Sequence, residues 1–230
     1  MKGKNPFRDL TKFERLLWLS SVTVVAISSF LSAGGSFFST LASLIGVTAL
    51  IFVAKGYVLG QVLTVAFAVV YGVVSWSQRY YGEMITYLCM SAPMAICAIV
   101  SWVRHPYQGT REVEVHRLTR RQVAILWPAA LGVSVLFYFI LRALGNANLL
   151  VSTLSITTSF IPSYLTYYRS PYYALGYAAN DLVLIVLWSI SAAVDLAYLP
   201  MVACFVMFLL NDLYGFINWK RMEKRQGNAQ

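Results

Sequence analysis

The chain has 230 residues, of which 59% are hydrophobic and only 12% are charged, and its mean hydropathy is +0.65. This composition is too apolar and too poor in charge for an ordinary soluble domain, so a soluble globular enzyme is excluded. The 18 Lys and Arg residues outnumber the 9 Asp and Glu residues, but they stand between apolar blocks, where they indicate membrane topology rather than nucleic-acid binding.

Long apolar runs follow one another along the chain, bounded by charged residues, Gly or Pro. Each is close to the roughly 20 residues that a helix needs to span a bilayer. The first run lacks a small-residue cleavage site, so we expect a retained helix and not a signal peptide. The predicted spans are 13–31, 36–54, 58–77, 84–103, 123–143, 149–167, 173–191 and 199–219.

Positive charge is distributed unevenly between the two sides that these eight spans define. With a cytoplasmic N-terminus, every Lys and Arg except Arg79 and Arg142 falls on the cytoplasmic side. Because Lys and Arg are enriched in cytoplasmic loops, this asymmetry predicts a multi-pass protein with both termini in the cytoplasm.

Short sequence patterns recur at a near-constant distance. Segment 55–60 resembles segment 169–176, and segment 101–104 resembles segment 218–221, at offsets of 114 to 117 residues. Such offsets predict two copies of a three-helix unit. Because an extra helix lies between the copies, they should enter the membrane in the same direction, as in the 3+1+3 plan of SWEET-like folds.

The expected architecture is therefore an all-α polytopic membrane protein with an N-terminal helix and a parallel 3+1+3 repeat. Its expected parts are the N-terminus with the extra helix (1–35), the first bundle (36–103), a basic loop with a linker helix (104–148), the second bundle (149–219) and a basic cytoplasmic tail (220–230).

Amide and phenol side chains recur at helical spacing on several of these spans. Groups of this kind suit an aromatic solute with hydroxyl groups, which stacks on rings and hydrogen-bonds to amides. The residues expected to bind such a solute are Gln61, Thr64, Tyr87, Tyr177, Asn180, Asp181, Trp188, Asn211, Tyr214 and Asn218.

Two features of the spans leave alternatives open. Asp181 and Asp212 are ionisable groups inside spans; they could line a solute path, carry a coupling proton or only pack helices together. Pro162 stands in a span rich in Ser and Thr, and it is either a hinge for alternating access or a static kink.

Motifs for other chemistry are missing. There is no phosphate-binding loop ending in Gly-Lys-Ser/Thr, no Gly-x-Ser-x-Gly elbow and no His-Glu-x-x-His sequence. His105 and His116 are the only histidines, so we expect no metal site and no cofactor. Transport is the favoured function, with a membrane enzyme or a structural subunit as the alternatives.

The sequence resembles the PnuC-type vitamin and nucleoside transporters over about residues 36 to 220. The resemblance rests on Val53-Ala-Lys-Gly56, on Tyr81-Gly-Glu83, on Thr153-Leu-Ser155 in the Ser/Thr-rich span and on the closing segment 214–219. It implies a bacterial inner-membrane facilitator, typically a homotrimer, that carries nicotinamide riboside or a related vitamin downhill. A cytoplasmic kinase would then trap the solute by phosphorylation.

One departure from the family pattern concerns the substrate. Nicotinamide riboside carriers of this type usually have a Trp-x-x-Trp pair, the second Trp four residues before an Asp or Asn. Here the acid is Asp181, while Tyr177 and Ala174 occupy the two Trp positions. Nicotinamide riboside is the first expectation, and thiamine, riboflavin or a deoxynucleoside remain alternatives.

Overall fold

A computed structural model describes residues 5–31, 37–77, 80–146 and 149–228. In this part of the chain eight helical segments are long and apolar enough to cross a membrane, which confirms the predicted all-α fold. The main helices are α1 (Lys12–Leu31), α2 (Phe37–Ala54), α3 (Val58–Ser77), α4 (Tyr81–Ile85), α5 (Ala92–Arg104), α6 (Arg120–Ala143), α7 (Leu149–Tyr167), α8 (Tyr173–Ala192) and α9 (Leu199–Gly227).

The fourth span is not one regular helix. It consists of α4, a π-helical segment η2 (Thr86–Ser91) and α5. Pro93 stands in the first turn of α5 and has no N–H to donate to the preceding turn, so the regular ladder cannot continue there. The backbone N–H of Ala92 instead bonds to the carbonyl of Tyr87, five residues back. Such π-helical turns often occur at functional sites.

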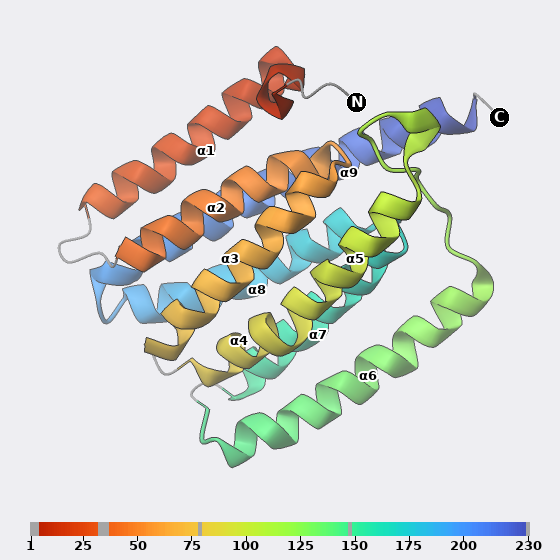
Figure 1. The fold of residues 1–230 in the computed structure, drawn as a ribbon. Coiled ribbons are helices and arrows are strands. Elements are labelled where there is room, and N and C mark those ends of the chain that lie inside the picture. Colours follow the sequence, from red (N-terminus) through yellow and green to blue (C-terminus); the bar gives the residue numbers. More distant parts are fainter. Residues whose placement is uncertain (1–4, 32–36, 78–79, 147–148, 229–230) are drawn as a thin grey trace.

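The spans form two three-helix bundles (Figure 1). In the first bundle α3 packs against both α2 and α5, and in the second bundle α8 packs against both α7 and α9. The bundles meet through α2 against α9 and α5 against α7. The linker helix α6 packs on α7, and α1 packs on α2 and α9. The first helix of each bundle thus contacts the last helix of the other bundle. Two parallel copies would produce this symmetric arrangement.

The turns between the first two helices of each bundle share an unusual backbone feature. Gly56, between α2 and α3, has φ +68°, and Arg169, between α7 and α8, has φ +57°. A left-handed conformation is uncommon outside glycine, so the two residues mark equivalent positions, 113 residues apart. This offset is close to the 114 to 117 residues that separate the recurring sequence patterns.

The loop between α5 and α6 joins these two turns at the end of the molecule where both termini lie (Figure 1). The backbone N–H of Val113 donates to the carbonyl of Gly56 (2.9 Å), and that of His116 donates to the carbonyl of Arg169 (3.1 Å). The backbone of this loop therefore hydrogen-bonds to both bundles and links them at this end of the molecule.

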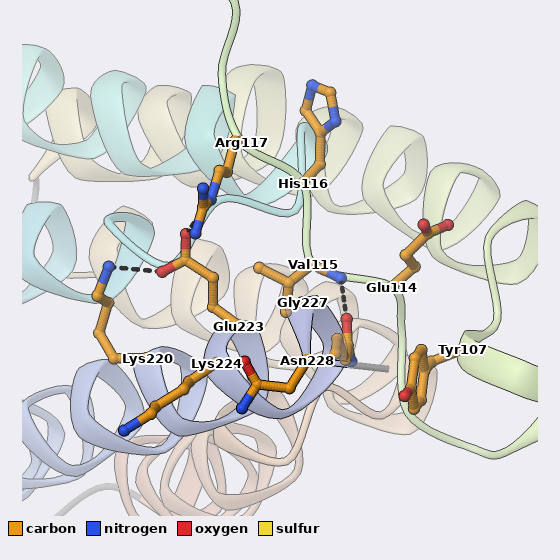
Figure 2. A pocket seen from close by; sticks show the side chains of 11 residues that line it. Tyr107, Glu114, Val115, His116, Arg117, Lys220, Glu223, Lys224, Gly227 and Asn228 are labelled. Atoms are coloured by element: carbon orange, nitrogen blue, oxygen red, sulfur yellow. Dashed lines mark hydrogen bonds and ion pairs between the residues drawn. The ribbon is translucent and has the colours of Figure 1, made fainter. Parts of the chain in front are cut away.

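Helix α9 continues eight residues beyond the predicted end of its span, to Gly227. Polar contacts stabilise the extension: Arg117 and Lys220 both pair with Glu223, at 2.8 and 2.5 Å (Figure 2). In addition, the side chain of Gln226 accepts a hydrogen bond from the backbone N–H of Val115 (2.7 Å). An apolar-run criterion stops at the first basic residue and does not detect contacts of this kind.

Helix α1 is attached to the bundles by polar contacts at its N-terminal end. The buried carboxylate of Glu14 pairs with Lys55 (3.0 Å) and accepts a hydrogen bond from Tyr214 of α9 (2.8 Å). Nearby, Asp9 pairs with Arg111 (2.8 Å). Burial and the neighbouring carboxylate of Asp9 raise the pKa of Tyr57 to about 12, so its hydroxyl stays protonated and donates to Asp9 (3.5 Å).

Candidate functional site

A cavity lies between the two bundles, bordered by α2, α3, η2, α7, α8 and α9. Its volume is about 60 Å³, which holds a few water molecules but is well below the roughly 300–1,000 Å³ of a typical small-molecule pocket. The helices would have to separate before a solute of nucleoside size could enter. Six of the predicted binding residues line this cavity: Gln61, Thr64, Tyr87, Tyr177, Asn180 and Asp181.

The amide of Asn180 is fixed by two hydroxyl groups from α7. Its Oδ1 atom accepts hydrogen bonds from Thr158 (2.8 Å) and Ser159 (2.9 Å). Because both hydroxyls occupy the oxygen, the orientation of the amide is set and its Nδ2 donor is directed away from α7. Asn180 is thus a pre-positioned donor in the wall of the cavity.

Aromatic rings form much of the remaining wall. Phe67 of α3 packs edge-on against Tyr87, with 5.7 Å between ring centroids, and at a tilt against Phe208 of α9, at 5.4 Å. On the opposite side the hydroxyl of Tyr177 is 3.2 Å from that of Ser163. Gly46 allows this arrangement, because a Cβ atom there would lie 2.3 Å from Phe208.

Two carboxyl groups meet at the cavity. Asp181 of α8 and Asp212 of α9 both line it, both are buried, and their side chains are within hydrogen-bonding reach of each other. The Oδ2 atom of Asp181 is buried and has no hydrogen-bond partner among the described residues, so it could accept a hydrogen bond from a solute only after the helices separate.

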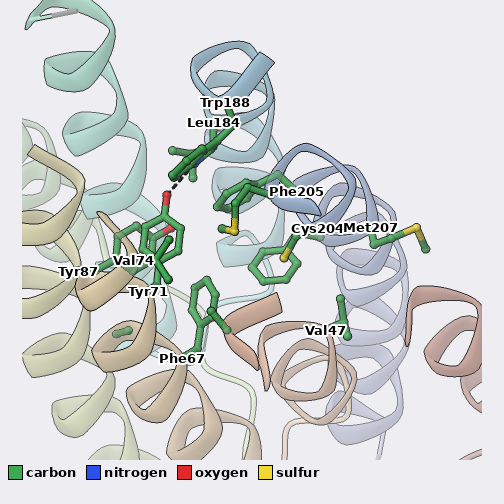
Figure 3. Packing of buried hydrophobic residues seen from close by; sticks show 14 of the residues in the cluster. Val47, Phe67, Tyr71, Val74, Tyr87, Leu184, Trp188, Cys204, Phe205 and Met207 are labelled. Atoms are coloured by element: carbon green, nitrogen blue, oxygen red, sulfur yellow. Dashed lines mark hydrogen bonds between the residues drawn. The ribbon is translucent and has the colours of Figure 1, made fainter. Parts of the chain in front are cut away.

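The other four predicted residues lie outside the cavity lining. Trp188 donates to the hydroxyl of Tyr71 (2.8 Å) within the hydrophobic core (Figure 3). Asn211 and Tyr214 face α1, because the amide of Asn211 donates to Ser21 (3.0 Å) and the hydroxyl of Tyr214 donates to Glu14.

Asn218 belongs to the same set. It donates to the carbonyl of Ala54 (2.8 Å) and so holds α9 against the end of α2. These contacts make Asn211, Tyr214 and Asn218 helix-packing groups in this conformation.

Sequence reasoning missed several cavity residues. Phe67, Phe208 and Ser91 line it, yet none was singled out, since apolar and small polar residues are common in every span. Ser159 also lines it and was noted only as one of the hydroxyl residues around Pro162. Asp212 was noted only as an alternative. Among the described residues no cluster of His, Cys, Asp and Glu side chains could hold a metal ion.

Pro162 lies inside α7, which runs through it without ending. The residue packs tightly against α8, because a Cβ atom on Gly176 would lie 2.9 Å from the Pro162 Cβ. The turn that carries Pro162 also presents Ser159 and Ser163 to the cavity side chains Asn180 and Tyr177. A change in the bend of α7 would therefore move the cavity wall directly.

Known proteins similar to this chain are transporters. The model of the family described as "Nicotinamide mononucleotide transporter" matches residues 36–221. The nicotinamide riboside transporter PnuC of Neisseria mucosa is 28% identical over 226 residues, which cover 95% of this chain and 85% of that protein. The protein of the same name from Haemophilus influenzae is 24% identical over 212 residues, covering 91% of each chain.

The fold has a counterpart among solved structures as well. A structure titled "Crystal structure of the Vitamin B3 transporter PnuC" superimposes with a TM-score of 0.84 at 23% identity and covers 97% of this chain and 100% of that one. The likeness extends over nearly the whole molecule, α1 included. The chain thus belongs to the nicotinamide mononucleotide transporter family and is a multi-pass membrane transporter, not an enzyme.

Proposed function

We propose that this protein carries nicotinamide riboside, or a closely related vitamin or nucleoside, across the membrane by facilitated diffusion. The observation that carries the proposal is the cavity between the two bundles, where aromatic rings, amides and two carboxyl groups converge. Its relatives from Neisseria mucosa and Haemophilus influenzae are named for the transport of nicotinamide riboside.

The cavity residues match the chemistry of such a solute. Tyr87 and Tyr177 offer ring faces for a flat heterocycle. The Nδ2 donor of Asn180, together with Gln61 and Thr64, would hydrogen-bond the ribose hydroxyls or a ring carboxamide. The unpartnered Oδ2 of Asp181 would accept a hydrogen bond or balance a cationic ring. Thiamine, riboflavin and deoxynucleosides share parts of this chemistry and are the alternative substrates.

The cellular setting of the proposal follows from the charge distribution and from the family. The protein would lie in a bacterial inner membrane with both termini in the cytoplasm. It would form a homotrimer with one path per protomer, and phosphorylation of the solute by a cytoplasmic kinase would keep uptake running downhill. Pro162 would be the hinge that lets α7 bend while the cavity opens.

Uptake into proteoliposomes tests the proposal. Purified protein is reconstituted without any kinase, and the internal concentrations of nicotinamide riboside, thiamine, riboflavin and a deoxynucleoside are followed over time. We expect one of these solutes to equilibrate and then stop at equal concentrations inside and outside. Failure of every solute to equilibrate would overturn the transport assignment for this substrate class.

A proton-coupled mechanism is a second candidate, favoured by the contact between Asp181 and Asp212. A carboxyl pair that shares a proton near a solute site could release that proton when the solute binds. With an inward proton gradient, the solute would then accumulate above its external concentration, and an uncoupler would abolish the accumulation. Asp212→Asn would convert accumulation into simple equilibration. Equilibration alone in the unmodified protein would exclude coupling.

A further inference from the structure

A buried carboxylate outside the cavity has no partner in the part of the chain that the structure describes. Glu83 of α4 is 1% exposed, and neither of its carboxylate oxygens makes a hydrogen bond to a described residue. The hydroxyl of Ser155 on α7 lies beside the carboxylate, but the two groups do not meet in regular hydrogen-bond geometry. Burying a carboxyl group without hydrogen-bond partners is unfavourable, so a carboxyl group kept in such a position is a candidate for a functional role.

The surroundings of Glu83 are aromatic. Tyr80 and Tyr87 flank Glu83 in the chain, three residues before it and four residues after it, and Tyr71 of α3 packs on the ring of Tyr87. The rings of Tyr71 and Tyr87 are 4.3 Å apart, and both belong to the aromatic core shown in Figure 3. Tyr80 in turn packs edge-on against Trp188, at 5.1 Å.

The position of Glu83 places it next to the solute path. Tyr87 lines the central cavity, and Glu83 stands four residues before it, about one helical turn away. Since α4 lies at the end of the bundle opposite the two termini (Figure 1), Glu83 lies between that end and the cavity. The π-helical segment η2 begins at Thr86, directly between the two residues.

We propose that Glu83 forms, with Tyr71, Tyr80 and Tyr87, a binding site for a delocalised organic cation on the way to the cavity. We call these four residues the distal site. Aromatic faces attract cations through their quadrupoles. The carboxylate of Glu83 would supply a full negative charge for the cation, because no described side chain already pairs with it. The site is closed in this conformation, so binding accompanies opening of that end of the bundle. The inference rests on the proposed transport function and specifies the charge of the preferred solute: a positively charged aromatic ring.

Paired ligands that differ in charge test the distal site directly. Binding of 1-methylnicotinamide, a cation, and of nicotinamide, which is neutral, is measured by calorimetry on detergent-purified protein. We expect the cation to bind more tightly, and Glu83→Gln to weaken cation binding about tenfold while changing the neutral ligand less than about twofold. Asp195→Asn is the matched control, because it removes an exposed acid near the same end of the molecule and should change neither.

Two further variants keep the test decisive. Glu83→Asp retains the charge and should retain the preference for the cation. Should Glu83→Gln fail to fold, Tyr80→Leu removes one aromatic wall and should weaken cation binding about threefold. Equal effects on both ligands, or equal binding of both ligands to the unmodified protein, would overturn the proposal, as would the absence of any binding.

Uptake measurements separate this inference from the proposed function. Nicotinamide riboside is a cation, and its reduced dihydro form is a neutral molecule of nearly the same shape. If the unmodified protein equilibrates neither compound, the proposed function fails, and the binding experiment alone decides the distal site. If it transports both compounds and Glu83→Gln slows both equally, the transport function stands and the distal site is refuted.

Discussion

Trp102 and Trp219 make the same hydrogen bond in opposite halves of the chain. The indole N–H of Trp102 donates to the carbonyl of Thr166 in α7 (3.0 Å), and that of Trp219 donates to the carbonyl of Val53 in α2 (2.9 Å). The two rings contact each other, with 5.4 Å between centroids. In each half of the chain, a Trp side chain from the last helix therefore bonds to the last turn of the first helix in the other half. This symmetry supports two parallel repeats.

This reciprocity predicts matched effects of two substitutions. Trp102→Phe and Trp219→Phe each remove one buried hydrogen bond, so each should lower the free energy of unfolding by about 1 kcal/mol. Thermal unfolding in detergent measures both. Trp127→Phe, at a residue that is 61% exposed, is the control and should have little effect. A large loss in one variant with none in the other would argue against equivalent roles.

The cavity predicts different consequences for two asparagines that the sequence treated alike. Asn180→Ala removes the positioned amide donor, so uptake should fall about tenfold. Its stability should fall by about 1 kcal/mol, because the buried hydroxyl of Ser159 loses its acceptor, whereas the hydroxyl of Thr158 keeps the carbonyls of Leu154 and Ser155 as acceptors. Uptake rates in proteoliposomes, normalised to folded protein, provide the measurement.

Asn211→Ala is the matched control for Asn180→Ala. Its amide donates to Ser21 of α1 (3.0 Å) and to the carbonyl of Met207 (2.7 Å), so the substitution should lower stability by about 1 kcal/mol. Uptake per folded molecule should stay unchanged. A tenfold loss of uptake in Asn211→Ala with normal uptake in Asn180→Ala would move the binding site to the α1 side of α9.

The buried pair of Glu14 and Lys55 predicts strong coupling between α1 and the first bundle. Glu14→Gln leaves Lys55 buried without a countercharge, and removing one partner of such a pair costs about 3–5 kcal/mol. The double variant Glu14→Gln with Lys55→Met should recover much of that loss, because no charge is then left unpaired. A double-mutant cycle measured by unfolding tests this, and simple additivity of the two losses would contradict it.

Helical spacing did not predict which neighbours Asn211, Tyr214 and Asn218 contact. Their helical spacing placed them correctly on one face of α9, but spacing does not tell which neighbour that face meets. Helix α1 packs against Asn211 and Tyr214, and the end of α2 packs against Asn218. The cavity is instead lined by Phe208 and Asp212, on another face of α9. The direction of a helix face is set by tertiary packing, which a single sequence does not encode as a simple period.

The boundaries of two spans, in contrast, followed directly from the sequence. Residues 58–77 and 149–167 were predicted with the bounds that α3 and α7 have, because apolar runs end where charges or turn residues begin. The π-helical segment before Pro93 was not predicted. A proline indicates that a backbone hydrogen bond is lost, but whether the helix kinks, ends or widens depends on the surrounding packing.

Gly60 allows α2 and α3 to approach each other closely. A Cβ atom there would lie 2.4 Å from the backbone nitrogen of Val53 and 2.8 Å from the carbonyl carbon of Phe52. Since backbone atoms cannot move aside as a flexible side chain can, Gly60→Ala should force the helices apart at a cost of about 1–3 kcal/mol. Because Gln61 and Thr64 follow on the same helix and line the cavity, uptake should fall as well.

Gly132 of α6 provides the control for this prediction. A Cβ atom at Gly132 would meet nothing within 4 Å, so Gly132→Ala should be neutral or slightly stabilising, as Ala is the better helix former. Thermal unfolding and proteoliposome uptake of the two variants give the comparison. Equal stability and equal uptake would mean that α2 and α3 are not held at this distance, and that the cavity wall they form tolerates displacement.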